Sequence, residues 1–123
     1  IDVPDHCGNA PRKAVVRDLA IALVVGDRVF LEQVLHADFE WTVNGEPPIK
    51  GVNAVWKRIS NQPRAHTLEI FTVLTHGTEC AVDGKITFAN GSSRLFGHFL
   101  RFTGGAKTAK VKVIRTYFHA TSA

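Results

Sequence analysis

Residues 80–102, CAVDGKITFANGSSRLFGHFLRF, are the stretch that decides the fold. Apolar and polar residues alternate on both sides of the dipeptide Asn90-Gly91, which is a strong signal for a tight hairpin turn. We therefore expect a strand over Cys80–Phe88 and an antiparallel strand over Arg94–Phe102. The internal glycine of the first strand weakens a regular ladder, so we expect a β-bulge at Asp83-Gly84.

Segments on either side extend this hairpin. Thr67–Thr75 is rich in β-branched residues and reads as a preceding strand, and His76-Gly77-Thr78 is a turn. After the loop at Gly104-Gly105, Lys110–His119 alternates as the last strand. The second half of the chain therefore predicts four strands joined by hairpins.

The first half has helical spacing instead. Apolar residues from Val15 to Leu23 recur on one helix face, and Gly26 ends that helix. Asp27 opens a second helix, whose apolar face holds Phe30, Leu31, Val34 and Leu35. A short strand, Phe39–Val43, precedes a third helix that carries Val52, Val55, Trp56 and Ile59 on one face. Helices followed by hairpin-connected strands predict an α+β fold.

Length and composition indicate one globular domain, residues 1–123, with 45% hydrophobic and 21% charged residues. The longest strictly apolar run is Leu19–Val25, whereas a membrane span needs about 20 residues. The chain also has no signal-peptide pattern. We expect a cytoplasmic protein with no membrane partner.

The net charge of +4 is unevenly distributed. Residues 1–83 hold eight basic and eleven acidic residues, whereas residues 84–123 hold seven basic residues and no acidic one. Such asymmetry can mark a polyanion-binding surface, or it can be the solvated face of an amphipathic sheet. No nucleic-acid-binding motif accompanies the charge, so we do not expect a nucleic-acid partner.

Two cysteines, Cys7 and Cys80, permit one disulfide but lack the spacing of a metal or redox site. Unpaired thiols in a reducing compartment are the expected state, with the disulfide as the alternative. The histidines show no metal-ligand spacing, and no phosphate-binding loop is present. We therefore expect no metal and no cofactor.

The order of these segments resembles the nuclear transport factor 2-like superfamily, which includes the SnoaL-like polyketide cyclases. The resemblance rests on Ala22–Asp27 followed by Phe30 and Ala37–Trp41, on Ile49-Lys50-Gly51 before the helix with Trp56, and on Val113–Phe118. Within the superfamily the chain looks most like small uncharacterised bacterial proteins, through Cys7-Gly8-Asn9, Leu19–Ala22, Thr75-His76-Gly77 and Ala81–Gly84.

The resemblance implies a cone: a strongly curved mixed sheet wrapped around three N-terminal helices, as in the cystatin-like or SnoaL-like α+β barrel. It also implies a pocket at one end of the cone and a homodimer built through the sheet. This fold hosts isomerases, dehydratases, epoxide hydrolases and plain binding proteins, so the fold alone does not assign a reaction.

The catalytic residues of the known enzymes carry over poorly. Ketosteroid isomerases use a tyrosine, a carboxylate base and a protonated aspartate, and these positions match Leu19, Thr42 or Val43, and His98. The last-strand aspartate of limonene-type epoxide hydrolases matches Thr116, which is no general base. Scytalone-dehydratase-type chemistry needs several tyrosines, whereas this chain has only Tyr117.

His98 is the remaining candidate for chemistry. If Phe96, His98 and Leu100 face one way, His98 lies in an apolar stripe that points into the cone. It is then either a hydrogen-bonded core or ligand-orienting residue, or a catalytic acid or base. A catalytic histidine needs a carboxylate to orient it, and Asp83 is the candidate, although it is equally the turn-favouring neighbour of Gly84.

The aromatic residues suggest where a ligand would bind. Trp41 and Trp56 are either core residues or part of a pocket wall. The expected pocket residues are Trp41, Trp56, Phe96, His98, Thr116 and Phe118.

Three functions follow from these observations. The first is binding of a small, largely apolar molecule in the cone pocket. The second is an isomerase, cyclase or dehydratase, hence an isomerase- or lyase-type enzyme, with His98 as acid or base. The third is an interaction module that uses the basic C-terminal sheet.

Overall fold

The structure is a computed structural model that describes residues 10–121. These residues form nine elements, three helices and six strands. A Cys7–Cys80 disulfide was the alternative to unpaired thiols, and Cys7-Gly8-Asn9 was one motif of the resemblance to small bacterial proteins. Cys7 and this motif precede the first described residue.

The three predicted helices are present as α1 (Ala10–Val25), α2 (Arg28–Val34) and α3 (Val52–Ser60). Gly26 ends α1 with a φ of 77°, a left-handed conformation that glycine adopts without a steric cost. Asp27 caps α2, because its carboxylate accepts a hydrogen bond of 3.2 Å from the Phe30 N–H. Leu35, which the helical pattern assigned to α2, is instead the first residue of the next strand.

The strands form one mixed sheet. They are β1 (Leu35–Val43), β2 (Ile49–Lys50), β3 (Ala65–His76), β4 (Glu79–Phe88), β5 (Ser93–Phe102) and β6 (Val111–Thr121). Their order in the sheet is β2-β1-β6-β5-β4-β3. The pair β1–β6 is parallel and the other pairs are antiparallel. The hairpin predicted at Asn90-Gly91 joins β4 to β5.

The predicted bulge at Asp83-Gly84 is wrong in its position. Ile70 pairs with Gly84 and Thr72 with Asp83, so the extra residue is Phe71, in the neighbouring strand β3. Gly84 instead allows two strands to approach closely, because a Cβ at this position would lie 2.0 Å from the Glu69 carbonyl oxygen on β3. The missing side chain lets β3 come close, and the bulge adds to the curvature of the sheet.

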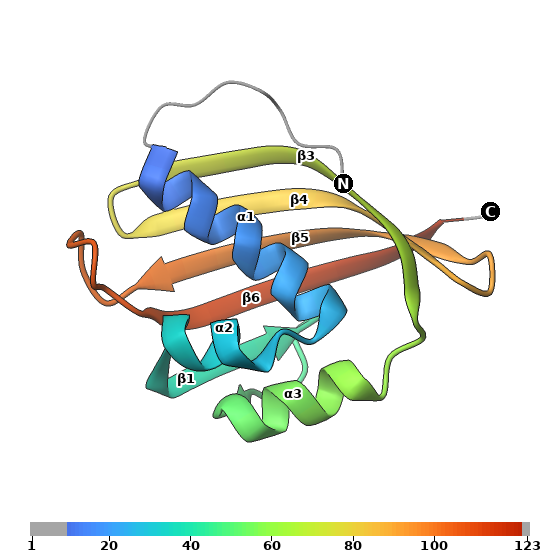
Figure 1. Ribbon diagram of the computed structural model, residues 1–123, viewed down its shortest axis with the longest axis horizontal. Coiled ribbons are helices and arrows are strands. Elements are labelled where there is room, and N and C mark those ends of the chain that lie inside the picture. Colours follow the sequence, from blue (N-terminus) through green and yellow to red (C-terminus); the bar gives the residue numbers. More distant parts are fainter. Residues whose placement is uncertain (1–9, 122–123) are drawn as a thin grey trace.

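The sheet curves around the helices, which cover its inner face (Figure 1). Helix α1 packs against β3 and β4, whereas α3 packs against β1 and β2. Alternation along each strand sends one set of side chains into the core between these layers. On β5 this set includes Phe96, His98 and Leu100, as predicted. The chain therefore has the expected α+β architecture, a curved mixed sheet around three helices.

Candidate functional site

The interior of the sheet holds a hydrogen-bonded group of three side chains. His98 on β5 lies opposite Thr116 on β6, and Trp41 lies on β1, the other neighbour of β6. The Trp41 indole N–H donates to Thr116 Oγ1 at 2.7 Å, and His98 Nδ1 lies 2.7 Å from the same oxygen. All three residues are buried. Thr116 therefore links the tryptophan to the histidine.

The hydrogen bonds of this group favour one tautomer of His98. The indole N–H of Trp41 can only donate, so the Thr116 oxygen accepts from it. The arrangement that uses every proton has the Thr116 hydroxyl donating to His98 Nδ1. In this assignment the ring proton of His98 sits on Nε2, which makes Nε2–H its remaining donor.

His98 is a neutral residue at physiological pH. Its complete burial and, to a smaller extent, the positive charge of Arg94 lower its pKa from 6.5 to about 3. Such a histidine is too weak a base to accept a proton near neutral pH. Its chemistry is therefore that of a fixed hydrogen-bonding group.

The structure does not bring Asp83 to His98. The residue opposite His98 on β4 is Val82, whereas Asp83 lies opposite Gly97. Adjacent residues of a strand point to opposite faces, and Asp83 is exposed whereas His98 is buried. The carboxylate proposed to orient the histidine therefore lies on the outer face of the sheet.

Five of the six expected pocket residues, His98 included, form one group. The Phe96 ring centroid is 4.9 Å from that of His98, and the Phe118 ring meets it edge-on at 6.5 Å. Thr116 and Trp41 complete the group through their hydrogen bonds. Phe118 is partly buried, and the other four are core residues. The sixth, Trp56, lies elsewhere, 38% exposed on α3.

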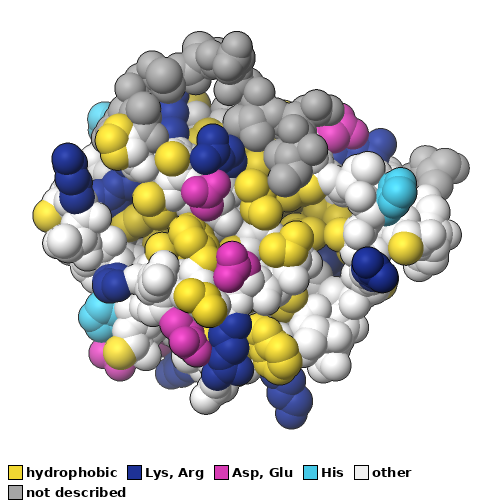
Figure 2. All heavy atoms as spheres, viewed as in Figure 1, with side chains coloured by type: hydrophobic (Ala, Val, Ile, Leu, Met, Phe, Trp, Pro, Cys, Tyr) yellow, Lys and Arg dark blue, Asp and Glu magenta, His cyan; other side chains and the backbone are white. Residues whose placement is uncertain are grey.

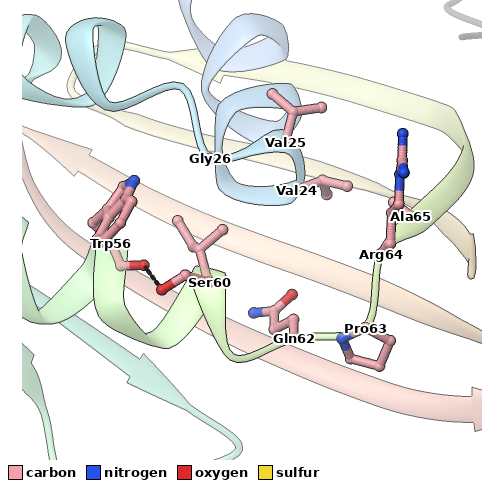
Figure 3. A pocket seen from close by; sticks show the side chains of 10 residues that line it. Val24, Val25, Gly26, Trp56, Ser60, Gln62, Pro63, Arg64 and Ala65 are labelled. Atoms are coloured by element: carbon pink, nitrogen blue, oxygen red, sulfur yellow. Dashed lines mark hydrogen bonds between the residues drawn. The ribbon is translucent and has the colours of Figure 1, made fainter.

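Trp56 belongs to an open pocket of about 490 Å³ between the end of α1, helix α3 and the start of β3. Figure 3 shows Trp56 and Ser60 of α3 and, from the end of α1, Val24 and Val25. The segment that leaves α3 supplies the rest of the wall. The lining residues are Val24, Val25, Gly26, Trp56, Ile59, Ser60, Gln62, Pro63, Arg64 and Ala65.

Sequence reasoning found only Trp56 among these residues. The lining residues come from two stretches of the chain, residues 24–26 and 56–65, and local periodicity does not report that these stretches meet. The one available signal was the segment Gln62-Pro63-Arg64, where a helix ends and a strand has not yet begun.

Arg94 connects this pocket to the interior group. It precedes Phe96 by two residues on β5 and therefore points to the same inner face. Its guanidinium carbon lies 3.8 Å from the centroid of the Phe118 ring and 5.1 Å from that of Phe88. One of its terminal nitrogens donates to the Gln62 side-chain oxygen at 3.3 Å. Gln62 lines the pocket, so Arg94 lies directly behind the pocket wall.

The charge of Arg94 is not neutralised by a carboxylate of residues 10–121, whose ion pairs do not include it. Its Nε is buried and has no hydrogen-bond partner in that part of the chain. Burial, followed by the nearby charge of Arg58, lowers the pKa of Arg94. From the sequence, Arg94 was expected only as one of the seven basic residues of the C-terminal part.

The seven basic residues of the C-terminal part do not share one face. Arg94 points inward, Arg101 pairs with Glu79, and Lys112 lies 3.9 Å from Asp38. Arg115 lies over the Phe99 ring on the outer face. On the helix face, Figure 2 shows basic side chains interspersed with acidic ones. This distribution does not favour a continuous polyanion-binding surface.

The outer face of the sheet exposes large apolar side chains. Leu74, Leu95, Phe99 and Tyr117 are each at least 37% exposed. A shallow depression of about 310 Å³ lies beside Gly97, next to Leu74, Asp83 and Phe99. The rings of Phe99 and Tyr117 meet edge-on at 6.1 Å.

No group of three or more His, Cys, Asp or Glu side chains among residues 10–121 could hold a metal ion. None of the helices formed by these residues has the length and hydropathy needed to cross a bilayer. Cys80 is buried, and burial is the main cause that raises the pKa of its thiol.

Comparison of the sequence with protein-family models and with curated proteins gives no significant match. Solved structures match over nearly the whole chain. An NTF2-like protein of unknown function from Burkholderia xenovorans has a TM-score of 0.76 at 16% identity, over 93% of this chain and 87% of that one.

Two further structures carry functional descriptions. A protein from Kribbella flavida, provisionally described as a ketosteroid isomerase, has a TM-score of 0.75 at 16% identity, over 93% of this chain and 82% of its own. A protein from Jannaschia, provisionally described as a SnoaL-like polyketide cyclase, has a TM-score of 0.74 at 12% identity, over 94% of this chain and 91% of its own. At such identities the likeness establishes architecture, and the chain has the NTF2-like, SnoaL-like fold.

Proposed function

We propose that this protein binds a small, largely apolar molecule in the pocket between α1, α3 and β3. The observation that carries the proposal is the pocket itself. Its volume of about 490 Å³ is within the range of ligand sites, roughly 300–1,000 Å³. Apolar side chains and the Trp56 ring provide contact area, and Ser60, Gln62 and Arg64 provide a few polar groups.

The contact between Gln62 and Arg94 supports a site that reaches inward from the pocket. Arg94 stacks on Phe118, and Phe118 meets His98. Five of the residues expected to line the site from the sequence therefore lie behind the pocket rather than in its wall. A ligand that displaces Gln62 would approach Arg94 and Phe118 first.

A ligand screen tests the proposal. A panel of small apolar compounds is added to the protein, and the melting temperature and tryptophan fluorescence are recorded. Compounds that bind should raise the melting temperature, because they bind the folded state. They should also change the emission of Trp56, and a Trp56→Phe variant should lose that change while keeping the thermal shift. A panel in which no compound shifts either signal would overturn the proposal.

Two exposed valines provide matched variants. Val25 lines the pocket and is 66% exposed, whereas Val29 does not line it and is 67% exposed. Val25→Arg places a charged side chain at the pocket wall and should weaken binding, whereas Val29→Arg should bind like the unmodified protein. Equal binding by the two variants would show that the ligand lies elsewhere.

An isomerase- or lyase-type enzyme is the second candidate, and the position of His98 on the inner face of β5, hydrogen-bonded to Thr116, favours it. With a pKa lowered to about 3, His98 would act as a hydrogen-bond donor to a carbonyl oxygen instead of as a general base. Isomerisation of a β,γ-unsaturated cyclic ketone, followed by the absorbance of the conjugated product, is a direct assay. Activity that survives His98→Leu, which has no side-chain donor, would exclude this role, and Asp83→Asn is the control that should leave turnover unchanged.

We also propose a homodimer through the sheet. The exposed apolar side chains Leu74, Leu95, Phe99 and Tyr117 on the outer face are the observation that supports it. Sedimentation analysis should give about twice the mass of the chain, and Phe99→Asp should give the monomer. Val29→Asp, on the helix side, is the control. A monomeric unmodified protein at high concentration would overturn this proposal.

We also propose that the protein is located in the cytoplasm. This proposal rests on cysteine usage that is typical of a reducing compartment.

A further inference from the structure

Arg94 is a half-buried cation that lacks a counter-ion among residues 10–121. Buried charges in proteins are normally paired, because removal from water costs free energy that a partner must offset. Here the guanidinium contacts two aromatic rings and one neutral amide oxygen. The aromatic faces attract the cation, but they supply no hydrogen-bond acceptor for the buried Nε.

The charges around Arg94 make the lack of an anion more pronounced. Arg58 is close enough to lower the pKa of Arg94, and Arg64 lines the adjacent pocket. The lining of that pocket contains no aspartate or glutamate. Glu46 lies 3.9 Å from Arg58 and so offsets that charge instead of the charge of Arg94. Apolar side chains beside a cation that no carboxylate of residues 10–121 neutralises would suit a molecule that is apolar at one end and anionic at the other.

We infer that the ligand of this pocket is an apolar carboxylate, and that Arg94 binds its carboxylate group while the pocket wall holds its apolar part. This inference rests on the proposed ligand-binding function and specifies the class of molecule. Gln62 lies between the two parts of the site: in the free protein its amide oxygen accepts a hydrogen bond from the Arg94 guanidinium. A carboxylate is a stronger acceptor for a guanidinium than an amide, so it displaces Gln62 and also reaches Nε–H.

Paired compounds test the inference. The probes are 2-naphthoate and 2-naphthamide, and dodecanoate and dodecanol, which share their apolar parts and differ in charge. Affinities are measured by calorimetry at pH 7.5, where both acids are ionised. The unmodified protein should prefer each carboxylate over its neutral counterpart by about tenfold or more, the usual value of a charge-assisted hydrogen bond. Arg94→Met should remove this preference and leave the affinity for the neutral compounds within about twofold.

Arg101→Met is the matched control, because Arg101 lies on the same strand with its guanidinium on exposed Glu79. It should keep the preference for carboxylates. If the neutral compounds bind as well as the acids, or if Arg94→Met keeps the preference, the inference is overturned while apolar ligand binding stands. If none of the four probes binds, the pocket is not a site for such molecules, and the inference fails together with the proposed function.

Gln62→Glu offers a test that needs no ligand. The new carboxylate would stand where the amide oxygen now lies, 3.3 Å from the Arg94 guanidinium, and would act as a built-in counter-ion. We expect a higher melting temperature and the loss of the preference for 2-naphthoate over 2-naphthamide. A purely structural role of Arg94, stacking on Phe118, predicts instead that Gln62→Glu leaves the ligand preference unchanged, and that result would overturn the inference.

Discussion

His98 and Thr116 lie opposite each other on β5 and β6, and 2.7 Å separates His98 Nδ1 from Thr116 Oγ1. The same hydroxyl accepts a hydrogen bond from the Trp41 indole at 2.7 Å. One small side chain therefore satisfies two buried polar groups that come from strands on either side of it. This relationship explains why a neutral histidine is stable inside an apolar sheet.

Removal of the Thr116 hydroxyl should be costly. Thr116→Val keeps the shape of the side chain but leaves the Trp41 N–H and His98 Nδ1 buried without their partner. We expect a loss of about 2–4 kcal/mol in the free energy of unfolding, measured by denaturant titration. Thr116→Ser keeps the hydroxyl and should lose only about 1 kcal/mol, the value of one buried methyl group. Equal losses in the two variants would mean that the hydrogen bonds contribute little.

His98 should make stability depend on pH below neutrality. Its pKa is lowered to about 3 in the folded protein, against 6.5 as the ordinary value, so the unfolded chain binds a proton that the folded chain does not. Stability therefore falls as the pH decreases from 6.5 towards 3, by up to about 1.4 kcal/mol per pH unit from this group.

Denaturant titrations at pH 7 and pH 5 measure this effect. His98→Gln should reduce the difference between the two pH values, whereas His119→Gln, at an exposed position on β6, should not. An unchanged pH dependence in His98→Gln would contradict the assignment of His98 as buried and neutral.

Two glycines of neighbouring strands should respond differently to alanine. At Gly84 a Cβ would lie 2.0 Å from the Glu69 carbonyl oxygen and 2.8 Å from the Phe96 ring. At Gly97 a Cβ would meet no atom within 4 Å. Gly84→Ala should therefore destabilise the protein by roughly 2–3 kcal/mol through overpacking. Gly97→Ala should change the melting temperature little. A larger loss of stability in Gly97→Ala than in Gly84→Ala would contradict the close approach of β3 to Gly84.

The cap of α2 contributes less to the stability of the protein than the close approach at Gly84, and it can be tested separately. Asp27→Ala removes the carboxylate that accepts from the Phe30 N–H and should cost about 1 kcal/mol. Asp27→Ser supplies another capping oxygen and should recover most of that loss. Thermal unfolding of the two variants makes the comparison, and identical melting temperatures would argue against a role of the cap in stability.

Local sequence predicted the elements well because their causes are local. Asp27 and Gly26 mark a helix boundary, and Asn90-Gly91 marks a hairpin, by their own backbone preferences. The period of two along Arg94–Phe102 was enough to turn His98 inward, because side chains of a strand alternate irrespective of their neighbours. The sequence by itself therefore determined the three helices, the strands β3 to β6 and the inner face of β5. It did not indicate the short strand β2, nor that β1 begins at Leu35.

Only the tertiary structure decided which side chains meet. Asp83 was expected beside His98, but the register between β4 and β5 places Val82 there, and register depends on pairing along the whole strand. The bulge falls at Phe71 because the neighbouring strand adapts to Gly84. The sequence indicated a surface charge at Arg94, whereas in the structure Gln62, after the end of α3, contacts it. Trp56 lines a pocket that residues 24–26 and 56–65 form together. Such contacts join residues far apart in the chain, and no local preference encodes them.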